Sequence, residues 1–304
     1  MQKHLIVIVG PTGIGKTKTA IKIAQHYNTE IISADSRQIF KELKIGTAAP
    51  TQEELNTVIH HNIATRSITD YYSAWEFEKD ALEISSNLFK THDQLLLTGG
   101  SMMYIDAICK GIDDIPTIDK ELRDELQNQY ITQGIDYFRR QLKQLDPEFY
   151  QQVDLQNHKR VIHAVEICLM TGKPYSSLRT NTIKKRPFHI IKAGLELDRA
   201  DVYNRINLRV DKMVQMGLID EAREFYTHKE LNSLNTVGYK EIFAHFDGEY
   251  DINKAIELIK RNTRRYAKKQ LTWFKKDQET LWFKPDNISE IISYIDSKII
   301  NCPT

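Results

Sequence analysis

The amino-acid sequence predicts an α/β protein in which a parallel β-sheet is flanked by helices and carries an inserted all-helical subdomain. Short apolar, β-branched runs alternate with helical patterns near the N-terminus, and residues 116–189 show helical patterns with few strand signals. Strands that alternate with helices indicate a parallel sheet with right-handed crossovers. We therefore expect a core of residues 1–115 and 190–304, interrupted by an insertion of residues 116–189.

The first part of the core is predicted from four segments. Leu5–Val9 is a continuous apolar run, typical of a buried parallel strand, and a helix is expected from about Lys16. Further strands are expected in "EIISADS" and "QLLLTGG", with a helix between them at about Trp75–Phe89. This order of strands and helices is typical of a doubly wound parallel sheet.

The insertion and the C-terminal part are predicted to be mainly helical. The insertion contains the helical patterns "DKELRDELQNQY", "IDYFRRQLKQL" and "HKRVIHAVEICLMTG", the last of which stops at Gly172 and Pro174. After the basic segment "TIKKRPFH", the run "IIKAGLEL" returns to strand character. Two long helices are then expected in "ADVYNRINLRVDKMVQMG" and "INKAIELIKRNTRRYAKKQLTWFKK".

Composition excludes several classes of protein. The 304 residues are 41% hydrophobic and 27% charged, with a net charge of only +1, so a polyanionic partner would have to meet a local basic patch. Three scattered cysteines, Cys109, Cys168 and Cys302, do not make a disulfide framework or a thiolate metal site. No stretch reaches the roughly 20 apolar residues of a membrane span, and no signal peptide is recognised. We expect a cytoplasmic protein without a membrane partner.

The strongest motif is "GPTGIGKT", which fits the phosphate-loop pattern G-x-x-x-x-G-K-[ST] between a predicted strand and a predicted helix. Backbone N–H groups of such a loop surround phosphates, Lys16 supplies a positive charge, and Thr17 can hold a Mg²⁺ ion. The fold prediction is accordingly a P-loop NTPase-like sheet. The residues expected to bind the phosphates are Gly10, Pro11, Thr12, Gly13, Ile14, Gly15, Lys16 and Thr17.

The loop alone leaves the phosphate compound open. A P-loop kinase or NTPase usually carries an Asp at the end of a buried strand to hold Mg²⁺. The run "QLLLTGG" ends without one, whereas "EIISAD" ends in Asp35, which fits a metal-binding residue, a base beside the phosphates or a simple turn cap. The pair His60-His61 suggests a zinc site, but neighbouring residues of an extended chain point in different directions, so we interpret the pair as structural.

The last long helix is strongly basic. Helical spacing puts Arg261, Arg265 and Lys268 along one side, which could follow a phosphate backbone, and Tyr266, Trp273 and Phe274 are interleaved with them. A solvated face explains the charges equally well, and the aromatic residues fit a core. Basic residues at Lys159-Arg160 and Lys184-Lys185-Arg186 favour a polyanion larger than a nucleotide. The basic residues of the helix region are Lys254, Lys260, Arg261, Arg264, Arg265, Lys268, Lys269, Lys275 and Lys276.

Together, these stretches resemble the tRNA dimethylallyltransferases, also called tRNA isopentenyltransferases, of the bacterial type. The resemblance rests on "GPTGIGKT", "SADSRQIF", "IGTAAP", "HHNI", "TGGSMMYIDA", "KRVIHAVEICLMTGKP", "RINLRVDKMVQMGL", "TVGYKEI" and "RNTRRYAKKQLTWFKK". They occur in the order of that family and cover nearly the full length. The resemblance implies transfer of a dimethylallyl group from dimethylallyl diphosphate to the N6 amine of the adenine 3′ of the anticodon in tRNA.

The resemblance also implies roles for individual residues. Asp35 would be the general base, and the Ser101 hydroxyl would position the adenine. The phosphate loop, with Mg²⁺ on Thr17, would hold the diphosphate together with Arg205 and Arg209, although both arginines also fit surface charges. The residues that would contact tRNA are Asp35, Ser36, Arg37, Gln38, Ser101, Arg123, Lys159, Arg160, Val161, Ile162 and His163.

Some positions depart from the pattern of the resembled family. Ser101 stands where Thr is typical, His163 replaces the more usual Arg, and Ala49 stands where many relatives have Lys. Alternatives to the prenyltransferase are a P-loop small-molecule kinase, a noncatalytic RNA-binding protein and an adenylate isopentenyltransferase that acts on a free nucleotide. The kinase would leave the basic helix and the insertion without a purpose. We expect a monomer whose partners are tRNA and dimethylallyl diphosphate.

Overall fold

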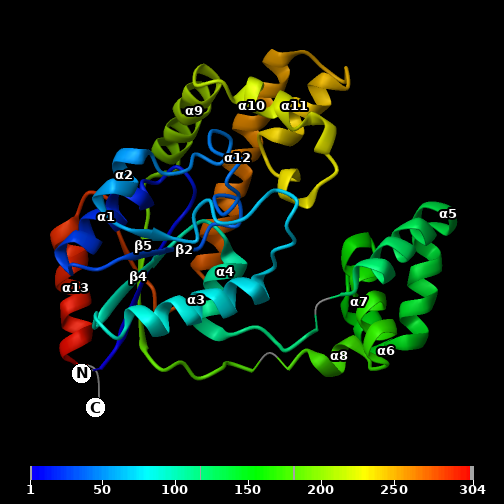
Figure 1. The fold of residues 1–304 in the computed structure, drawn as a ribbon, viewed down its shortest axis with the longest axis horizontal. Coiled ribbons are helices and arrows are strands. Elements are labelled where there is room, and N and C mark those ends of the chain that lie inside the picture. Colours follow the sequence, from blue (N-terminus) through cyan, green and yellow to red (C-terminus); the bar gives the residue numbers. More distant parts are fainter. Residues whose placement is uncertain (1, 117, 181, 302–304) are drawn as a thin grey trace. The chain divides into compact units, whose positions relative to one another are not determined.

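The chain folds into two compact units, each considered by itself below. The computed structural model describes residues 2–116, 118–180 and 182–301 (Figure 1). One unit combines the residues up to Cys109 with those from Lys185 onward, and the other comprises Lys110–Lys184. The insertion predicted from the sequence was placed at residues 116–189.

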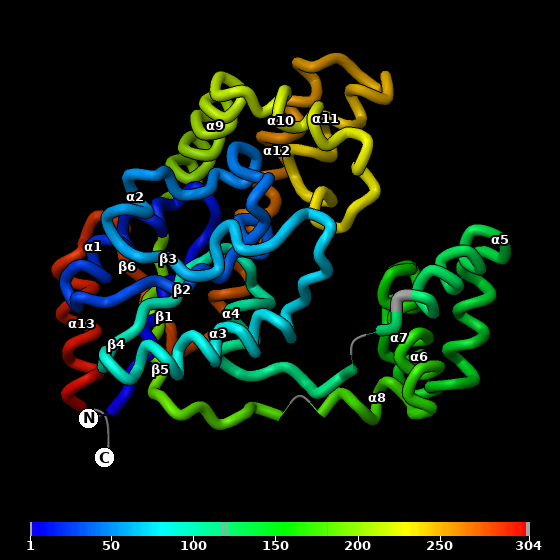
Figure 2. Tube along the Cα trace, viewed as in Figure 1, coloured from blue at the N-terminus to red at the C-terminus, as the bar shows by residue number. Residues whose placement is uncertain are grey.

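The first unit contains a six-stranded sheet in which every neighbouring pair of strands is parallel. The strand order is β3-β2-β4-β1-β5-β6, and Figure 2 labels all six strands. Ile6 at the centre of β1 lies between Leu96 of β4 and Ile191 of β5. The strands are β1 His4–Val9, β2 Ile31–Ser33, β3 His60–His61, β4 Gln94–Thr98, β5 His189–Leu195 and β6 Leu281–Phe283. The predicted parallel α/β sheet is confirmed.

The four predicted strands are present, and two short edge strands were not predicted. β2 is shorter than "EIISADS" suggested, because the chain turns after Ser33. β3 and β6 have only two and three residues, too few to produce the alternating or apolar run that identifies a strand in a sequence.

Helices cover both faces of this sheet, with α1 and α13 on one face and α3 and α4 on the other (Figure 1). The helix predicted from Lys16 and the one predicted at Trp75–Phe89 are confirmed, as are both long C-terminal helices. The helices of this unit are α1 Lys16–His26, α2 Gln52–Thr57, α3 Ala74–Leu88, α4 Met102–Lys110, α9 Arg199–Gln215, α10 Leu218–Glu224, α11 Tyr239–Phe246, α12 Ile252–Phe274 and α13 Ile288–Ile300, with 3₁₀ turns η1 Tyr226–His228 and η2 Asn232–Leu234.

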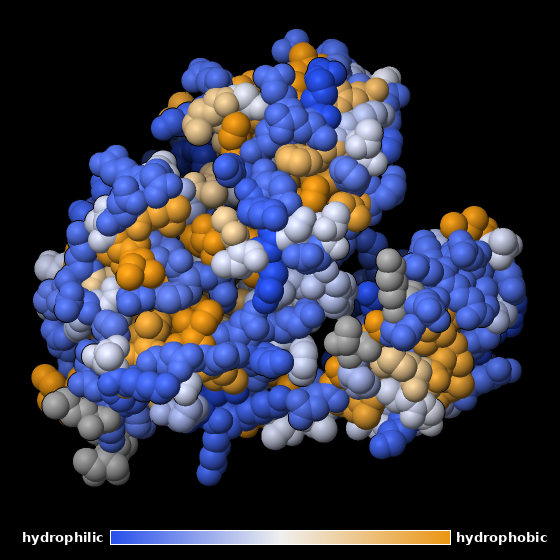
Figure 3. Space-filling view, in the orientation of Figure 1, coloured by the Kyte–Doolittle hydropathy of each residue, from blue (hydrophilic) through white to orange (hydrophobic). Residues whose placement is uncertain are grey.

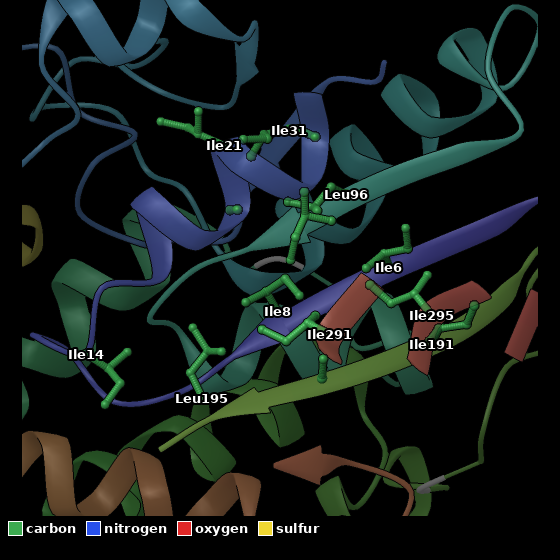
Figure 4. Packing of buried hydrophobic residues seen from close by; sticks show 14 of the residues in the cluster. Ile6, Ile8, Ile14, Ile21, Ile31, Leu96, Ile191, Leu195, Ile291 and Ile295 are labelled. Atoms are coloured by element: carbon green, nitrogen blue, oxygen red, sulfur yellow. The ribbon is translucent and has the colours of Figure 1, made fainter. Parts of the chain in front are cut away.

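Two hydrophobic clusters stabilise this unit. In the first, side chains of β1, β4 and β5 pack against α1 and α13, and Figure 4 shows Ile6, Ile8 and Leu195 of the sheet close to Ile291 of α13. The second cluster joins α9, α10, α11 and α12 around the fully buried ring of Tyr239. Burial of these side chains fixes α9 and α12 beside the ends of the strands, where the phosphate loop lies.

Within its described residues, the second unit has helices as its only regular secondary structure. It consists of α5 Lys120–Leu145, α6 Pro147–Gln152, α7 His158–Thr171 and α8 Tyr175–Leu178. α5 joins the first two predicted helical patterns and is broken by non-helical dihedral angles at Gly134 (φ 70°). α7 ends at Gly172 in the left-handed conformation, as predicted. The buried carboxylate of Asp146 is satisfied by N–H groups of Phe149 and Ser176 and by the Ser176 hydroxyl.

The surface and the cysteines agree with the composition. On the face shown in Figure 3, hydrophilic residues predominate and hydrophobic residues occur in scattered groups. Across the described part of the chain, every helix is too short or too polar to cross a membrane. Cys109 and Cys168 are buried, while Cys302 lies outside the described residues.

Candidate active site

The phosphate loop connects β1 to α1 and has the close approaches that its glycines predict. Gly10 and Gly13 have φ values of 153° and 81°. A Cβ atom on Gly10 would lie 2.9 Å from the Leu195 carbonyl oxygen, and one on Gly13 would lie 2.8 Å from the Ile206 side chain. Only glycine allows this loop to lie against β5 and α9. The Ile14 side chain is fully buried, so Ile14 contributes its backbone to the loop.

A pocket of about 750 Å³ lies beside this loop, within the first unit. Its walls come from the phosphate loop, from the segments that follow β2 and β4, and from helices α9 and α12. The carboxyl ends of parallel strands meet at this edge of the sheet, which is where α/β folds bind their ligands. The predicted site residues that line it are Thr12, Gly13, Gly15, Lys16, Thr17, Asp35, Ser36, Arg37, Gln38, Ser101 and Arg209.

Lys16 begins α1, and its side chain turns back over the loop. Its ammonium donates hydrogen bonds to the Gly10 and Pro11 carbonyl oxygens, both at 2.9 Å. Desolvation in the pocket lowers the pKa of Lys16 to about 7, with a further lowering by Arg209 that the nearby charge of Asp35 opposes. Lys16 therefore meets an incoming anion in a dehydrated setting, where charge interactions are strong.

Asp35 follows β2 and faces the same pocket. Its Oδ1 accepts hydrogen bonds from the backbone N–H groups of Arg37 (3.0 Å) and Gln38 (3.3 Å), which form the turn after the strand. Its Oδ2 faces Gly100, since a Cβ on that glycine would lie 3.1 Å from it. The turn-cap role that the sequence left open is present, and it occupies only one of the two oxygens. The other oxygen lies beside Gly100, which lines the same pocket as Lys16.

Ser101 lies next to Asp35 because the turns after β2 and β4 touch. The Ser101 N–H donates to the Ala34 carbonyl oxygen at 3.0 Å, and a Cβ on Gly99 would lie only 2.1 Å from that oxygen. The Ser101 hydroxyl oxygen accepts a hydrogen bond from the Tyr104 N–H at 3.4 Å in the first turn of α4. The structure thus brings together two residues predicted to contact the acceptor.

The two arginines of α9 have different positions. Arg209 lines the pocket, and its pKa is lowered by desolvation, against the nearby charge of Asp35 that raises it. Its guanidinium donates to the Thr47 carbonyl oxygen at 3.4 Å. Arg205 is outside the pocket lining. It donates to the Ile14 carbonyl oxygen at 3.0 Å and so stabilises the phosphate loop.

The segment Asp35–Gln38 is half-buried along one wall. The Gln38 amide donates to the carbonyl oxygens of Thr47 (3.2 Å) and Ala48 (3.1 Å), which ties this segment to the loop that precedes Ala49. Desolvation lowers the pKa of Arg37, while Tyr104, Asp35 and Tyr266 raise it, so this guanidinium lies among two aromatic rings and the carboxylate.

Gln270 of α12 is the main site residue that the sequence did not single out. Its side chain is fully buried and links the phosphate loop to the turn that carries Ser101. Tyr266, one helical turn earlier, also donates to that turn, at 3.3 Å to the Gly100 carbonyl oxygen. The motif "RNTRRYAKKQLTWFKK" contains both residues. The sequence prediction considered its basic residues, which suggested an exposed face that follows a phosphate backbone, and gave Gln270 no role.

The donor set is compatible with Mg²⁺ alongside phosphate oxygens. The hydroxyl of Thr17 and the carboxylate of Asp35 line the same pocket as the phosphate loop. Mg²⁺ commonly takes one or two protein oxygens and fills its other positions with phosphate oxygens and water. Among the described residues, no cluster of three or more His, Cys, Asp and Glu side chains could hold a metal without such help.

His60 and His61 do not form a metal pair. The His61 Nε2 pairs with Glu30 at 2.5 Å, and the His60 Nδ1 contacts the Val58 carbonyl oxygen at 2.7 Å. Burial lowers the pKa of His60, which favours its neutral form. The two rings serve different partners, in agreement with the structural interpretation.

The predicted tRNA contacts of the second unit lie on α5 and α7. Lys159 and Arg160 are exposed in the first turn of α7, and Ile162 is half-buried. Arg123 and His163 both approach the buried carboxylate of Glu166, at 3.4 and 3.5 Å. These two side chains thus have a partner within the unit.

Val161 has a different environment from the exposed Lys159 and Arg160. Its side chain is fully buried in the helical core with Leu126 and Phe138, so it stabilises the unit by packing. The sequence prediction treated the stretch 159–163 as a continuous contact, whereas a helix directs successive residues to different sides.

Comparison with known proteins identifies the family. The model of the family described as IPP transferase matches residues 38–277. The chain belongs to the IPP transferase family. Because the match begins after the phosphate loop and Asp35, this assignment is independent of both.

Relatives of this IPP transferase family member cover the full length. It is 58% identical over 297 residues to tRNA dimethylallyltransferase 1 of Bacteroides fragilis, covering 98% of this chain and 99% of that protein. It is 56% identical over 297 residues to tRNA dimethylallyltransferase 1 of Phocaeicola vulgatus, with the same coverage. These relatives favour a transferase over the small-molecule kinase.

Solved structures agree with the fold. The full-length tRNA isopentenylpyrophosphate transferase of Bacillus halodurans superposes with a TM-score of 0.71 at 35% identity, covering 99% of this chain and 97% of that one. A eukaryotic dimethylallyltransferase acting on tRNA superposes with a TM-score of 0.78 at 23% identity, covering 98% of this chain and 78% of that one, and supports the fold alone.

Proposed function

We propose that this protein transfers the dimethylallyl group of dimethylallyl diphosphate to the N6 amine of the adenine 3′ of the anticodon in tRNA. The observation that carries the proposal is the juxtaposition, in one pocket, of a phosphate loop with Lys16 and a carboxylate, Asp35, whose Oδ2 lies beside the pocket-lining Gly100. A leaving group and a proton acceptor are thereby placed beside each other. In the reaction, the N6–C1 bond forms, the C1–O bond breaks, and diphosphate departs with the electron pair.

On the leaving-group side, the chain supplies positive charge and backbone donors. The phosphate loop N–H groups at the start of α1 bind the diphosphate, and Lys16 leaves its carbonyl partners to neutralise the negative charge that develops on the bridging oxygen. Arg209 faces the same space from α9. Mg²⁺, held by the Thr17 hydroxyl, would add Lewis-acid stabilisation of the diphosphate.

On the acceptor side, the chain must activate a weak nucleophile. The lone pair of the adenine N6 amine is delocalised into the ring, so removal of a proton as the new bond forms lowers the barrier. Asp35 Oδ2 takes this proton, while Oδ1 stays fixed by the Arg37 and Gln38 N–H groups. The buried Ser101 beside it positions the base.

We propose tRNA as the acceptor because exposed basic residues lie on α12, a helix that lines this pocket. Arg261, Arg265 and Lys268 are exposed on that helix, whereas the half-buried Arg264 donates to Asn207 at 2.6 Å. A base that is turned out of its stack can reach a buried carboxylate. The names of the relatives support tRNA over a free nucleotide.

The remaining expectations also belong to the proposal. The exposed Lys159 and Arg160 of α7 suit a phosphate backbone, which makes the second unit a further tRNA contact. Dimethylallyl diphosphate is the second partner. We propose that the protein acts as a monomer, and that it acts in the cytoplasm because the acceptor is tRNA.

The test is a transfer assay with the purified chain, Mg²⁺, dimethylallyl diphosphate and unmodified tRNA. Digestion to nucleosides and mass spectrometry should reveal N6-dimethylallyl adenosine. Replacing the tRNA by adenosine monophosphate should give much less product. Phosphorylation of a small metabolite by ATP, without any prenylated adenosine, would contradict the proposal.

A further inference from the structure

The Gln270 side chain forms a bridge between two active-site loops that are remote in sequence. Its Oε1 accepts the N–H of Thr12 in the phosphate loop at 2.8 Å, and its Nε2 donates to the Gly100 carbonyl oxygen at 2.6 Å. The side chain is 0% exposed, so both of its polar atoms are satisfied inside the protein. Losing either partner would leave a buried polar group unpaired, which is costly.

The bond to Thr12 also determines which way the carbonyl of the same peptide, that of Pro11, points. A trans peptide is planar, so its N–H and C=O groups point in opposite directions. With the Thr12 N–H directed at Gln270, the Pro11 carbonyl of the same peptide is directed away from it, and this carbonyl accepts the Lys16 ammonium at 2.9 Å. Gln270 thereby orients the peptide that holds the phosphate-binding lysine in place.

The bond to Gly100 has the same consequence on the acceptor side. The Gly100 carbonyl and the Ser101 N–H belong to one peptide, and that N–H donates to the Ala34 carbonyl oxygen at 3.0 Å. Ala34 immediately precedes Asp35. A continuous series of hydrogen bonds and rigid peptides therefore runs from Lys16, through Gln270, to the backbone beside Asp35.

We propose that Gln270 is a positioning residue that sets the phosphate loop at a fixed distance from the turn carrying Ser101 and the strand end carrying Asp35. It holds the donor and acceptor halves of the pocket in register and takes no part in proton or group transfer. The inference rests on the proposed function, since it assigns Gln270 a share in that reaction. Reactions between two bound substrates are sensitive to small errors of alignment.

Only a neutral side chain that accepts at one atom and donates at the other matches both partners. The Thr12 N–H can only donate and the Gly100 carbonyl can only accept, so the residue between them must accept at one atom and donate at the other. Leu has neither group, and an ionised Glu would place its charge against the Gly100 carbonyl. Tyr266 already donates to that carbonyl at 3.3 Å, so it retains part of the acceptor-side contact when Gln270 is replaced.

The first test compares Gln270→Leu with Gln94→Leu, the same exchange at a half-buried position where β4 begins. The wild type, measured alongside, tests the proposed function itself. For folded Gln270→Leu we expect kcat to fall by at least about tenfold, with tRNA affinity within about twofold of the wild type. Gln94→Leu should keep the wild-type kcat. If the wild type is active and the two variants have equal kcat values, the inference about Gln270 is overturned, while the proposed function stands.

The second test uses Gln270→Glu and does not depend on tolerance of the leucine. A protonated Glu carries one donor and one acceptor and reproduces the amide, whereas an ionised Glu does not. The ratio of its kcat to that of the wild type should therefore rise as the pH falls. Lys16, Asp35, Arg37 and Arg209 are present in both proteins, so their own titration largely cancels in the ratio. A ratio that stays at the Gln270→Leu level at every pH would overturn the inference.

Discussion

The phosphate loop and helix α12 contribute to the same pocket in contrasting ways. The loop, Gly10–Thr17, is a continuous segment whose function depends on its own backbone N–H groups and one lysine. α12 contributes separate side chains from two faces, with the buried Gln270 and the exposed Arg265 on the same helix. A local motif carries its chemistry within a few residues, whereas a helix acquires its role only when folding brings partners to each face.

The largest effect is expected at Asp35, which lines the same pocket as both regions. Asp35→Asn keeps an oxygen for the Arg37 and Gln38 N–H groups but removes the proton acceptor. We expect kcat to fall by about 10²–10⁴-fold, the usual contribution of a general base, with tRNA affinity unchanged. Single-turnover transfer and a separate tRNA-binding titration measure the two quantities. A kcat within about threefold of the wild type would make Asp35 a turn cap only.

Lys16 gives the next largest effect and tests the loop by itself. Its pKa of about 7 means that the substrate-free protein loses this charge as the pH rises through neutrality. A bound diphosphate favours the ammonium, so binding takes up a proton and affinity should fall between about pH 6 and pH 8. Calorimetry with inorganic diphosphate and Mg²⁺ measures this dependence.

Lys16→Arg is the matched control, because a guanidinium stays charged throughout this range. Titration of the diphosphate itself is common to both proteins, so the difference between their profiles isolates Lys16. Parallel profiles for the two proteins would contradict the lowered pKa of Lys16.

The two arginines of α9 allow a comparison between a residue that lines the pocket, Arg209, and one that stabilises the phosphate loop, Arg205. Arg209→Ala removes a charge that faces the pocket, and we expect kcat/KM for dimethylallyl diphosphate to fall by about 10- to 100-fold. Arg205→Ala removes only the bond to the Ile14 carbonyl, so its effect should be at least several times smaller. Steady-state kinetics on both variants compare them directly. An equal or larger loss in Arg205→Ala would mean that Arg205 contacts the substrate.

The pocket residues of the phosphate loop could be predicted from the sequence, whereas the buried pocket residue of α12 could not. Lys16 and Thr17 could be named because strand, glycines and lysine are adjacent in the chain, and Asp35 because it ends an apolar run. Gln270 could not, because a buried glutamine gains a role only from partners such as Thr12 that lie far away in the sequence. Spacing alone cannot identify the side of a helix that faces a neighbour.

The same limit applies to neighbouring residues in the helical regions. Val161 stands within a basic stretch of α7, yet its side chain packs into the core. Arg264 has the same charge as Arg265 but is engaged with Asn207 and lies over the Tyr203 ring, 5.8 Å from its centroid. Neighbouring residues of a helix cannot be told apart by the sequence alone. Only tertiary packing shows which of them is buried or paired.

The smallest effect on the chemical step is expected from the exposed face of α12. Replacing Arg261, Arg265 and Lys268 together by Gln should weaken tRNA binding and lower the slope of log K against log salt by up to about 3, because each phosphate contact contributes about 0.9. The kcat at saturating tRNA should not change. An equal exchange at the exposed Lys22, Lys79 and Lys90 controls for net charge. The same slope in both triple variants would indicate a solvated face.

The central claim is that the phosphate loop holds the leaving group of an alkyl transfer and that no nucleotide is consumed. The most direct measurement counts products in a reaction that contains only the protein, Mg²⁺, dimethylallyl diphosphate and unmodified tRNA. We predict one diphosphate released for each dimethylallyl adenosine formed, without any added nucleoside triphosphate. A requirement for ATP, with ADP formed in proportion to the product, would contradict it.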